Sequence, residues 1–286
     1  MVNNKNFIDL HVHSNYSDGA LSPAQLVQRA KKLGLSTIAI ADHDSVAGVA
    51  EGKNAGMQNG IHVIPAVELS VQYKTLLDVH LLGFGIDYTD LVLVEKLNEF
   101  RERREHRNIE ILDRVNEKLR GEEFEQVPLA EVLAHAREVI GRPHIARALL
   151  DRGYVKNMED AFRRYLIPCN VPKFYWPVQD ALSMINRLGG IAVLAHPTSI
   201  SSDREELQVI ITELASMGLN GLEVYNNMAQ PDEMEFLRRL AGKLDLLITG
   251  GSDFHGMEEG IEMGKGRGGI RFTDTLLAPV LKRLHV

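Results

Sequence analysis

The sequence predicts an α/β barrel that is interrupted by a mainly helical insertion. Short apolar runs rich in β-branched residues alternate with helix-like stretches, a pattern typical of parallel βαβ units. Histidines and acidic residues follow several of these runs, and the carboxyl-terminal mouth of a parallel barrel would gather such side chains. The alternation stops between residues 89 and 177, and a chain of 286 residues is long enough for one barrel with an inserted lobe.

The predicted strands are short apolar segments rich in valine, isoleucine and leucine. In chain order they are Phe7–Val12, Thr37–Ala41, Val63–Val67, Val79–Ile86, Ile191–Ala195, Gly221–Tyr225 and Leu246–Thr249. Helices are predicted between several of them, at Pro23–Leu33, Asp203–Met217 and Pro231–Leu240. The first of these helices follows Ser22, whose hydroxyl is a candidate cap for the amides of the first turn.

The middle of the chain predicts helices without intervening strands. Leu91–Leu119 has the composition of one long charged helix, Pro128–Val139 predicts a second, and shorter helices are centred on Ala146 and Ala161. We therefore expect one domain that is formed by residues 1–88 and 178–286, and an insertion domain at residues 89–177 that covers the active site.

Composition argues against several classes of protein. The net charge of -7 disfavours a basic surface that grips duplex DNA. No apolar run approaches the ~18 residues of a membrane span, and the first residues do not resemble a signal peptide, so we expect a soluble cytoplasmic protein. The single cysteine, Cys169, has no partner for a disulfide or a thiolate zinc site, and we expect it to be a small buried residue.

Candidate metal ligands lie at or just after the predicted strands. His11 and His13 share one face of the first strand, because side chains alternate along a strand, and they can bind the same ion. The other candidates are Asp18, His43, Glu68, His80, His196, Asp253 and His255. Imidazole and carboxylate are the ligands expected for zinc, manganese or iron. Each histidine alone is a weak signal, but burying three carboxylates without a metal would cost several kcal/mol, so the joint pattern predicts a metal site.

Other polar residues have a less direct interpretation. Asp9 lies on the same strand face as His11, and Asp44 adjoins His43, so we expect both to orient histidines or to be structural. No function is expected for His62, His106, His135 and His285, which precede a strand, lie on charged helices or adjoin the last residue. The glycine-rich segment at residues 264–269 predicts a surface turn.

A second anion site is predicted in the insertion. The run Gly141-Arg142-Pro143-His144 places a proline at the start of a predicted helix. The free amides of that helix end, together with Arg142 and His144, could hold a phosphate between them. Lys173 is a further candidate for the same site. Ordinary helix capping and surface charge are the alternative interpretation.

At these residues the sequence resembles the polymerase and histidinol phosphatase (PHP) family. The family's motifs correspond here to His11-Val12-His13 with the following Ser17-Asp18-Gly19, to Asp42-His43-Asp44, to Ala195-His196-Pro197 and to Ser252-Asp253-Phe254-His255, with Glu68 and His80 between them. The match spans the whole predicted barrel. The insertion, with its Gly-Arg-Pro-His segment, is similar to the subgroup that contains ribonuclease AM and the 3',5'-nucleotide bisphosphate phosphatases.

The resemblance implies a distorted (β/α)7 barrel, similar to a TIM barrel, that holds three divalent ions of manganese, zinc or iron. By motif, the first ion would be bound by His11, His13, Glu68 and Asp253, the second by Glu68, His80 and His196, and the third by Asp18, His43 and His255. Such a centre carries net positive charge and would attract an anion. Asp253 and His255 are the catalytic candidates, and His255 or a water would protonate the leaving group.

These expectations describe a metal-dependent phosphoesterase. Arg142, His144 and Lys173 would hold the 5'-phosphate of a nucleotide while the metal centre hydrolyses its 3'-phosphoester. The substrate would be a 3',5'-bisphosphonucleotide, or an RNA with a 5'-monophosphate that is degraded in the 5'-to-3' direction. Neither a membrane nor duplex DNA is an expected partner.

Three alternatives remain open. A histidinol phosphatase would share the barrel and the metals, although the large insertion favours nucleotides. An amidohydrolase also begins with two histidines separated by one residue, but no lysine lies at a strand end to form a carbamate bridge. A noncatalytic module that binds metal or nucleotide is the third alternative, and the complete set of candidate ligands argues against it.

Overall fold

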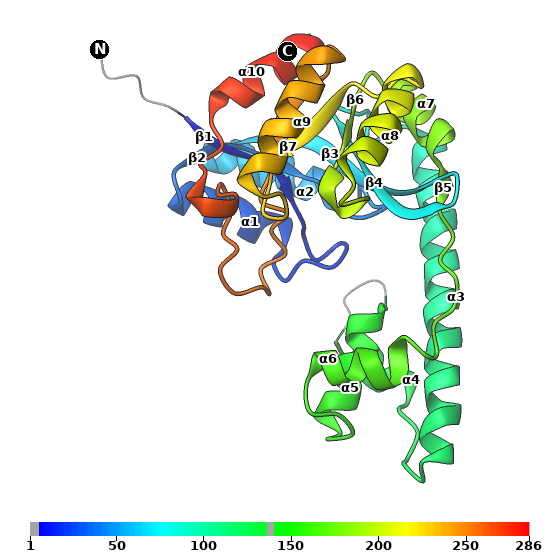
Figure 1. Cartoon of the computed structure of the whole chain (residues 1–286). Coiled ribbons are helices and arrows are strands. Elements are labelled where there is room, and N and C mark those ends of the chain that lie inside the picture. Colours follow the sequence, from blue (N-terminus) through cyan, green and yellow to red (C-terminus); the bar gives the residue numbers. More distant parts are fainter. Residues whose placement is uncertain (1–5, 136–139, 286) are drawn as a thin grey trace. The chain divides into compact units, whose positions relative to one another are not determined.

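The structure, a computed structural model, describes residues 6–135 and 140–285. The chain forms two compact units (Figure 1). One unit contains Met1–Val94 and Tyr175–Val286, and the other contains Glu95–Phe174. Among the helices that the structure describes, none is both long enough and apolar enough to cross a membrane.

The first unit is built on a mixed sheet of eight strands. The strands are β1 (Phe7–Val12), β2 (Leu35–Ile40), β3 (His62–Tyr73), β4 (Leu76–Phe84), β5 (Trp176–Pro177), β6 (Ile191–Leu194), β7 (Gly221–Tyr225) and β8 (Leu247–Gly250). Their spatial order is β1-β2-β3-β4-β6-β7-β8, and the short β5 pairs with β3. The predicted α/β fold class is therefore confirmed.

The two edge strands of this sheet approach each other just beyond the end of β8. The amide of Asp253 donates to the carbonyl of His11, and the amide of His13 donates to the carbonyl of Phe254, both at 2.9 Å. These bonds join β1 to the segment after β8, as expected for a sheet that curves into a distorted barrel. They also place the loop after β8 beside the predicted ligands of β1.

The parallel direction expected from the alternation of strands and helices does not hold for β4. This strand is antiparallel to both of its neighbours, β3 and β6. The physical reason is the length of the connection, because Tyr73 and Leu76 are separated by only two residues. A parallel crossover needs a dozen or more residues, whereas two residues suffice for a hairpin, and Lys74 has the positive φ of 53° that such a turn uses.

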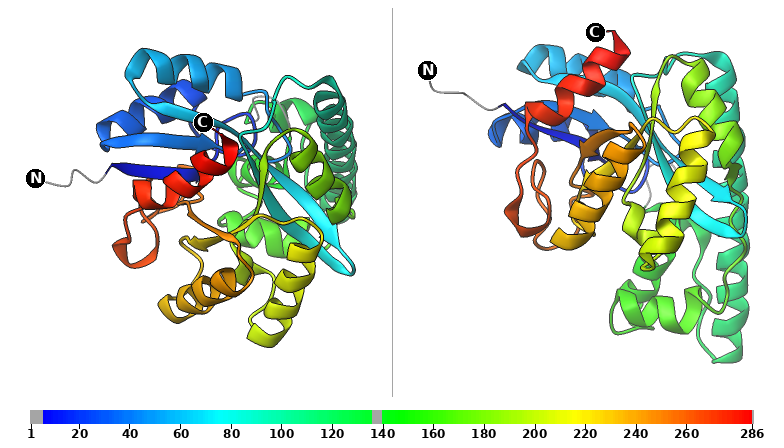
Figure 2. Two further views of the ribbon diagram at one scale, coloured as in Figure 1. Left: turned by 90° about the horizontal axis from the view of Figure 1, so that it is seen from above. Right: turned by 45° about the horizontal axis from the view of Figure 1, so that its top comes forward.

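Helices lie around the outside of the curved sheet (Figure 2). They are α1 (Pro23–Lys32), α2 (Val49–Asn59), α7 (Val178–Arg187), α8 (Arg204–Ser216), α9 (Pro231–Lys243) and α10 (Asp274–Leu284). The predicted cap of α1 is confirmed, because the hydroxyl of Ser22 accepts from the amide of Gln25 at 3.3 Å and Gln25 Oε1 accepts from the amide of Ser22 at 2.8 Å.

Two apolar clusters hold the helices against the sheet. One combines side chains of β1, β2, β3, β4 and β6 with Leu277 and Val280 of α10. The other packs Leu26, Val27 and Ala30 of α1 against side chains of β1 and β2. This burial fixes the strands whose ends carry the candidate metal ligands.

The second unit is helical, as the sequence predicts for this segment. Its elements are α3 (Leu91–Gly121, beginning in the first unit), α4 (Leu129–Leu133), α5 (Arg142–Asp151), α6 (Met158–Ala161) and the π-helical turn Phe162–Leu166. A separate core that includes Val115, Leu149 and Tyr165 holds them together. Cys169 is buried beside this core, as expected. The helix predicted at Pro128–Val139 is shorter than expected, since α4 ends at Leu133, and residues 136–139 lie outside the described residues.

Candidate metal centre

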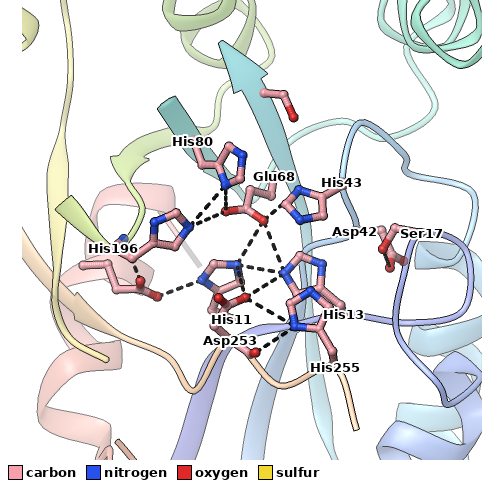
Figure 3. A network of polar contacts seen from close by, with 12 residues as sticks. His11, His13, Ser17, Asp42, His43, Glu68, His80, His196, Asp253 and His255 are labelled. Carbon is pink, nitrogen blue, oxygen red and sulfur yellow. Dashed lines mark hydrogen bonds and ion pairs between the residues drawn. The ribbon is translucent and has the colours of Figure 1, made fainter. Parts of the chain in front are cut away.

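Glu68 lies at the centre of a cluster that contains all nine predicted metal ligands. Figure 3 labels all of them except Asp18. The side chain of Glu68 is fully buried. Five imidazole nitrogens lie within 3.3 Å of its two carboxylate oxygens: His43 Nδ1 at 3.0 Å, His80 Nδ1 at 3.1 Å, His13 Nε2 and His196 Nε2 at 3.2 Å, and His11 Nε2 at 3.3 Å. A carboxylate with two shared oxygens among imidazoles has the donor set of a bridging metal ligand.

The barrel brings these side chains together from distant parts of the sequence. His13, His43, His196, Asp253 and His255 all lie just after β1, β2, β6 or β8, where the sequence predicts them. The prediction of strand-end positions is wrong for the ligands of β3 and β4.

Glu68 and His80 lie inside the long β3–β4 hairpin. His80 is opposite Ser70 in the antiparallel register, two residues beyond Glu68. The antiparallel direction of β4 explains the position of His80, because the beginning of this strand lies at the same end of the sheet as the carboxyl ends of the parallel strands.

Three groups of ligand atoms are compact enough to hold an ion. They are His11, His13, Glu68 and Asp253; His43, Glu68 and His80; and His13, Asp18, His43 and His255. His196 joins the second group through Glu68 Oε1. Burial decreases along the cluster, because the side chain of His11 is fully buried whereas that of Asp18 is 44% exposed. One side of the centre is therefore accessible to a ligand from solvent.

The side chains of the cluster are better arranged to bind a cation than to form hydrogen bonds with one another. Four of its buried polar atoms have no hydrogen-bond partner within the described part of the chain: His13 Nδ1, Asp18 Oδ1, His43 Nδ1 and Glu68 Oε2. Buried polar atoms in native proteins nearly always have partners, so these atoms indicate an additional group. His196 and Asp253 also have positive φ angles of 28° and 54°, which side-chain-bearing residues rarely adopt. The residues present thus fit divalent metal ions.

Opposite charges set the protonation of the cluster. Burial disfavours an ionised Glu68, but the surrounding imidazoles hold its pKa well below the usual value. Burial disfavours a protonated His13, yet the adjacent Asp253 and Glu68 carboxylates raise its pKa to about 10. For His43 burial prevails and lowers the pKa to about 3. Some of the nitrogens that face Glu68 therefore carry protons, and a metal ion must displace them in order to bind.

Sequence reasoning missed Glu223 of β7. This side chain is 1% exposed, and its two oxygens contact His11 Nδ1 and the amide of His196, both at 2.9 Å. The signal was a single carboxylate within the apolar strand Gly221–Tyr225, where a charged residue is costly to bury.

A second omission is the environment of Asp42. This buried carboxylate accepts hydrogen bonds from the amide and hydroxyl of Ser14, at 2.7 and 2.6 Å, and from the hydroxyl of Ser17 at 2.7 Å. It therefore ties the loop that follows β1, which contains Asp18, to the end of β2. No imidazole is among these partners.

The two carboxylates expected to orient histidines or to be structural accept hydrogen bonds from backbone amides. Asp9 accepts from the amides of His11 (3.2 Å), Ser252 (2.9 Å) and Gly264 (2.6 Å). Asp44 accepts from the amide of Ser70 at 2.9 Å. Asp9 thus also anchors the glycine-rich segment, which forms a turn closed by a hydrogen bond from the amide of Gly266 to the carbonyl of Ile270.

The predicted phosphate-binding residues Arg142, His144 and Lys173 belong to the second unit. Gly141 precedes α5, and its amide donates to His144 Nδ1 at 3.0 Å, so one ring nitrogen of His144 caps the helix. The guanidinium of Arg142 lies 5.8 Å from the centre of the Phe162 ring. The capping alternative therefore accounts for part of the Gly-Arg-Pro-His pattern, and the phosphate site stays a prediction.

Comparison with known proteins identifies the family. The family model described as the PHP domain matches residues 9–168, which include the first two motifs, Glu68, His80 and most of the insertion. The chain belongs to the PHP domain family. The resemblance found in the sequence motifs is therefore confirmed.

Several known proteins match this chain over nearly its whole length. A 3',5'-nucleoside bisphosphate phosphatase of Chromobacterium violaceum is 33% identical over 97% of this chain and 96% of its own length. A 5'-3' exoribonuclease of Haemophilus influenzae is 33% identical over 90% of this chain and 93% of its own. A structure from Bifidobacterium adolescentis, assigned as a metal-dependent phosphoesterase, has a TM-score of 0.82 with 29% identity and covers 97% of this chain and 96% of its own.

Proposed function

We propose that this chain is a metal-dependent phosphoesterase that hydrolyses the 3'-phosphoester of 5'-phosphorylated nucleotides. The observation that carries the proposal is the buried Glu68 carboxylate, which faces five imidazoles and belongs to two of the three candidate ion sites. A centre of this kind binds more than one divalent cation and attracts phosphate esters. The phosphatase and exoribonuclease relatives support the choice of a nucleotide substrate.

The proposed centre holds three ions of manganese, zinc or iron. His11, His13, Glu68 and Asp253 would bind the first, Glu68, His80 and His196 the second, and Asp18, His43 and His255 the third. When bound, such ions lower the pKa of a water molecule and neutralise charge on the phosphoryl oxygens. The buried end of the cluster excludes water, whereas the exposed Asp18 side admits the ester.

Asp253 and His255 are the proposed catalytic residues of the chain. Asp253 would help to hold the reacting centre in place, since its oxygen lies 3.1 Å from His13 Nε2 and 3.4 Å from His11 Nε2. The Nδ1 of His255 donates to the carbonyl of Asp253 at 2.9 Å, which directs Nε2 toward Asp18 at 3.3 Å. Burial opposes protonation of this ring, but the nearby Asp18 carboxylate raises the pKa of His255. Nε2 can either bind the third ion or carry a proton, so a water would protonate the leaving oxygen when that ion is bound.

Substrate selection is assigned to the insertion. We propose that residues 89–177 cover the active site and that Arg142, His144 and Lys173 bind the 5'-phosphate of a bisphosphonucleotide or of an RNA end. The amides at the beginning of α5 and a guanidinium together are the usual donors to a phosphate. A substrate that lacks the 5'-phosphate would lose this interaction.

The test is a turnover assay with four substrates in the presence of Mn²⁺. The panel contains 3',5'-bisphosphoadenosine, a short RNA with a 5'-monophosphate, the same RNA with a 5'-hydroxyl, and histidinol phosphate. We expect the first two to be hydrolysed at least about tenfold faster than the others, since a charge-assisted hydrogen bond contributes roughly 1.5–3 kcal/mol.

Each other outcome of this assay changes the proposal in a defined way. Preference for histidinol phosphate would overturn the nucleotide assignment but keep the metal-dependent phosphoesterase. Equal rates on the two RNAs would overturn the 5'-phosphate site. Absence of turnover on all four substrates by protein that contains metal would overturn the proposed activity.

A further inference from the structure

Glu223 connects two candidate metal ligands that come from different strands. Its Oε1 lies 2.9 Å from Nδ1 of His11, and its Oε2 accepts the amide hydrogen of His196 at 2.9 Å. Both oxygens of the side chain thus act as acceptors, which is what an ionised carboxyl group offers. Within the described residues, no lysine or arginine is paired with it.

The contact with His11 determines which ring nitrogen carries the proton. A carboxylate can only accept, so Nδ1 of His11 must be the donor. The other nitrogen, Nε2, is then the one left for a metal ion, and it lies 3.3 Å from Glu68 Oε2 and 3.4 Å from Asp253 Oδ1. This is the tautomer that a metal ion at the first group of ligands requires.

The contact with His196 supports an unusual backbone conformation. His196 has a φ of 28°, outside the regions that side-chain-bearing residues prefer. Its amide is buried with no alternative acceptor in the described part of the chain, and Glu223 satisfies it. The carboxylate therefore holds the residue that presents a second imidazole to Glu68.

The surrounding backbone is adapted to this contact. Gly251 follows β8, and a Cβ atom at this position would lie 2.2 Å from Cβ of His11 and 2.9 Å from Glu223 Oε1. Only glycine therefore leaves room for the bond between His11 and Glu223. A buried carboxylate is also expensive compared with an apolar residue of similar size, so packing alone does not explain its presence in β7.

We propose that Glu223 is a positioning residue of the metal centre: it fixes the Nδ1-protonated tautomer of His11 and, through the amide of His196, holds ligands of two ion sites in one arrangement. The inference rests on the metal centre of the proposed function. It concerns metal affinity rather than substrate choice, and it is therefore tested without any substrate.

The decisive variant is Glu223→Gln, which keeps the shape of the side chain. An amide has one acceptor oxygen and one donor nitrogen, so it cannot accept from both His11 and His196. If its oxygen keeps the His196 amide, its nitrogen donates to His11 Nδ1 and moves the proton of that ring to Nε2. We expect the affinity of metal-stripped protein for Mn²⁺ and Zn²⁺, measured by chelator competition, to fall by about 10- to 100-fold.

Asp42→Asn is the matched control. Asp42 is also buried beside the centre, but among the described residues its oxygens accept from Ser14 and Ser17 and contact no imidazole. The loop that it anchors carries Asp18, a ligand of the third group alone. We expect thermal unfolding of the metal-free protein to show comparable destabilisation in the two variants, with near wild-type affinity of the two sites that share Glu68 in Asp42→Asn alone. Equal loss of affinity in both variants would overturn the proposal, since the neutralisation of any buried carboxylate beside the centre would then have the same effect.

A measurement on the wild-type protein avoids dependence on the folding of the variant. In the Zn²⁺-loaded protein, ¹⁵N chemical shifts of labelled histidines should show the proton of His11 on Nδ1, and Zn²⁺-loaded Glu223→Gln should lose that signal. A proton on Nε2 in the wild type would overturn the proposal. If the wild type binds no metal, the proposed function fails as well; if the wild type and Glu223→Gln bind equally, only the role of Glu223 fails.

Discussion

The two units differ in the charged contacts that characterise them. In the first unit, Glu68 and His11 are fully buried and contact one another across strands far apart in sequence. In the second unit, Arg103 and Arg114 are 46% and 44% exposed and pair with glutamates four positions away on α3. Exposed pairs contribute roughly 0–1 kcal/mol each, whereas buried charges are costly unless their surroundings compensate for them.

This difference suggests a division of labour. Burying this polar cluster lowers the folding stability of the barrel. Ligands bound to the cluster would compensate for that loss. The helical unit can vary its surface charges at little cost, which suits residues that select a substrate. Changes in the barrel should therefore affect metal binding and turnover together, and changes in the helical unit should affect substrate preference or local stability alone.

The largest expected effect is that of Glu68→Gln. The neutral side chain would lose its attraction for the ions of two sites, so we expect metal content to fall and turnover of 3',5'-bisphosphoadenosine to drop by about 10³-fold or more. Metal content would be measured by mass spectrometry and turnover by phosphate release. Glu235→Gln is the control, because this glutamate is 42% exposed and pairs only with arginines of α9. Undiminished turnover in Glu68→Gln would show that the cluster is structural.

Acidification should weaken metal binding in the barrel. The pKa of His13 is about 10, so at pH 8 and at pH 6 its ring is protonated until a metal displaces the proton. Apparent affinity should fall about tenfold per pH unit for each proton displaced, and should rise again as the pH increases toward 10. Titration of metal-stripped protein with Zn²⁺ at pH 6, 7 and 8, corrected for the chelator's own protonation, would check this. An affinity that does not change with pH would exclude His13 as a ligand.

Sequence patterns were sufficient for the fold class and for the family. The alternation of apolar runs and helices indicated the barrel, and the motif around His11 and His13 indicated the PHP family, because local periodicity and ligand spacing are directly visible in a sequence. The bounds of the insertion, residues 89–177, stay a prediction. The ligand roles themselves stay predictions, although the structure brings all nine residues together.

Other features depend on three-dimensional contacts that no local pattern encodes. The antiparallel direction of β4 follows from a turn of two residues, yet it changes which end of that strand carries His80. Glu223 was overlooked because it is 212 residues from His11, and only closure of the sheet makes them neighbours. Nδ1 of His144 caps α5, as the capping alternative expects, and the role of His144 as a phosphate ligand stays a prediction.

Arg142→Ala tests the role assigned to the helical unit. If Arg142 binds the 5'-phosphate, the preference for 5'-monophosphorylated over 5'-hydroxyl RNA should fall about tenfold, as expected for the loss of one charge-assisted hydrogen bond, while metal content stays unchanged. Arg147→Ala is the control, since this residue lies on the same helix, is 58% exposed and pairs with Asp151. An unchanged preference in Arg142→Ala, or an equal loss in both variants, would contradict the assignment.

The smallest expected effect is that of Tyr165→Phe, which tests whether the helical unit can be destabilised without an effect on the metal centre. The ring is buried in the core of the helical unit, and its hydroxyl donates to Glu122 at 2.5 Å. Because Glu122 keeps Arg164 as a partner at 3.3 Å, the loss should be only about 1–2 kcal/mol. Hydrogen exchange should show faster opening of residues 158–166, with metal content and Mn²⁺-dependent turnover unchanged. A fall in metal content would show that the two units are energetically coupled, and the division of labour would then fail.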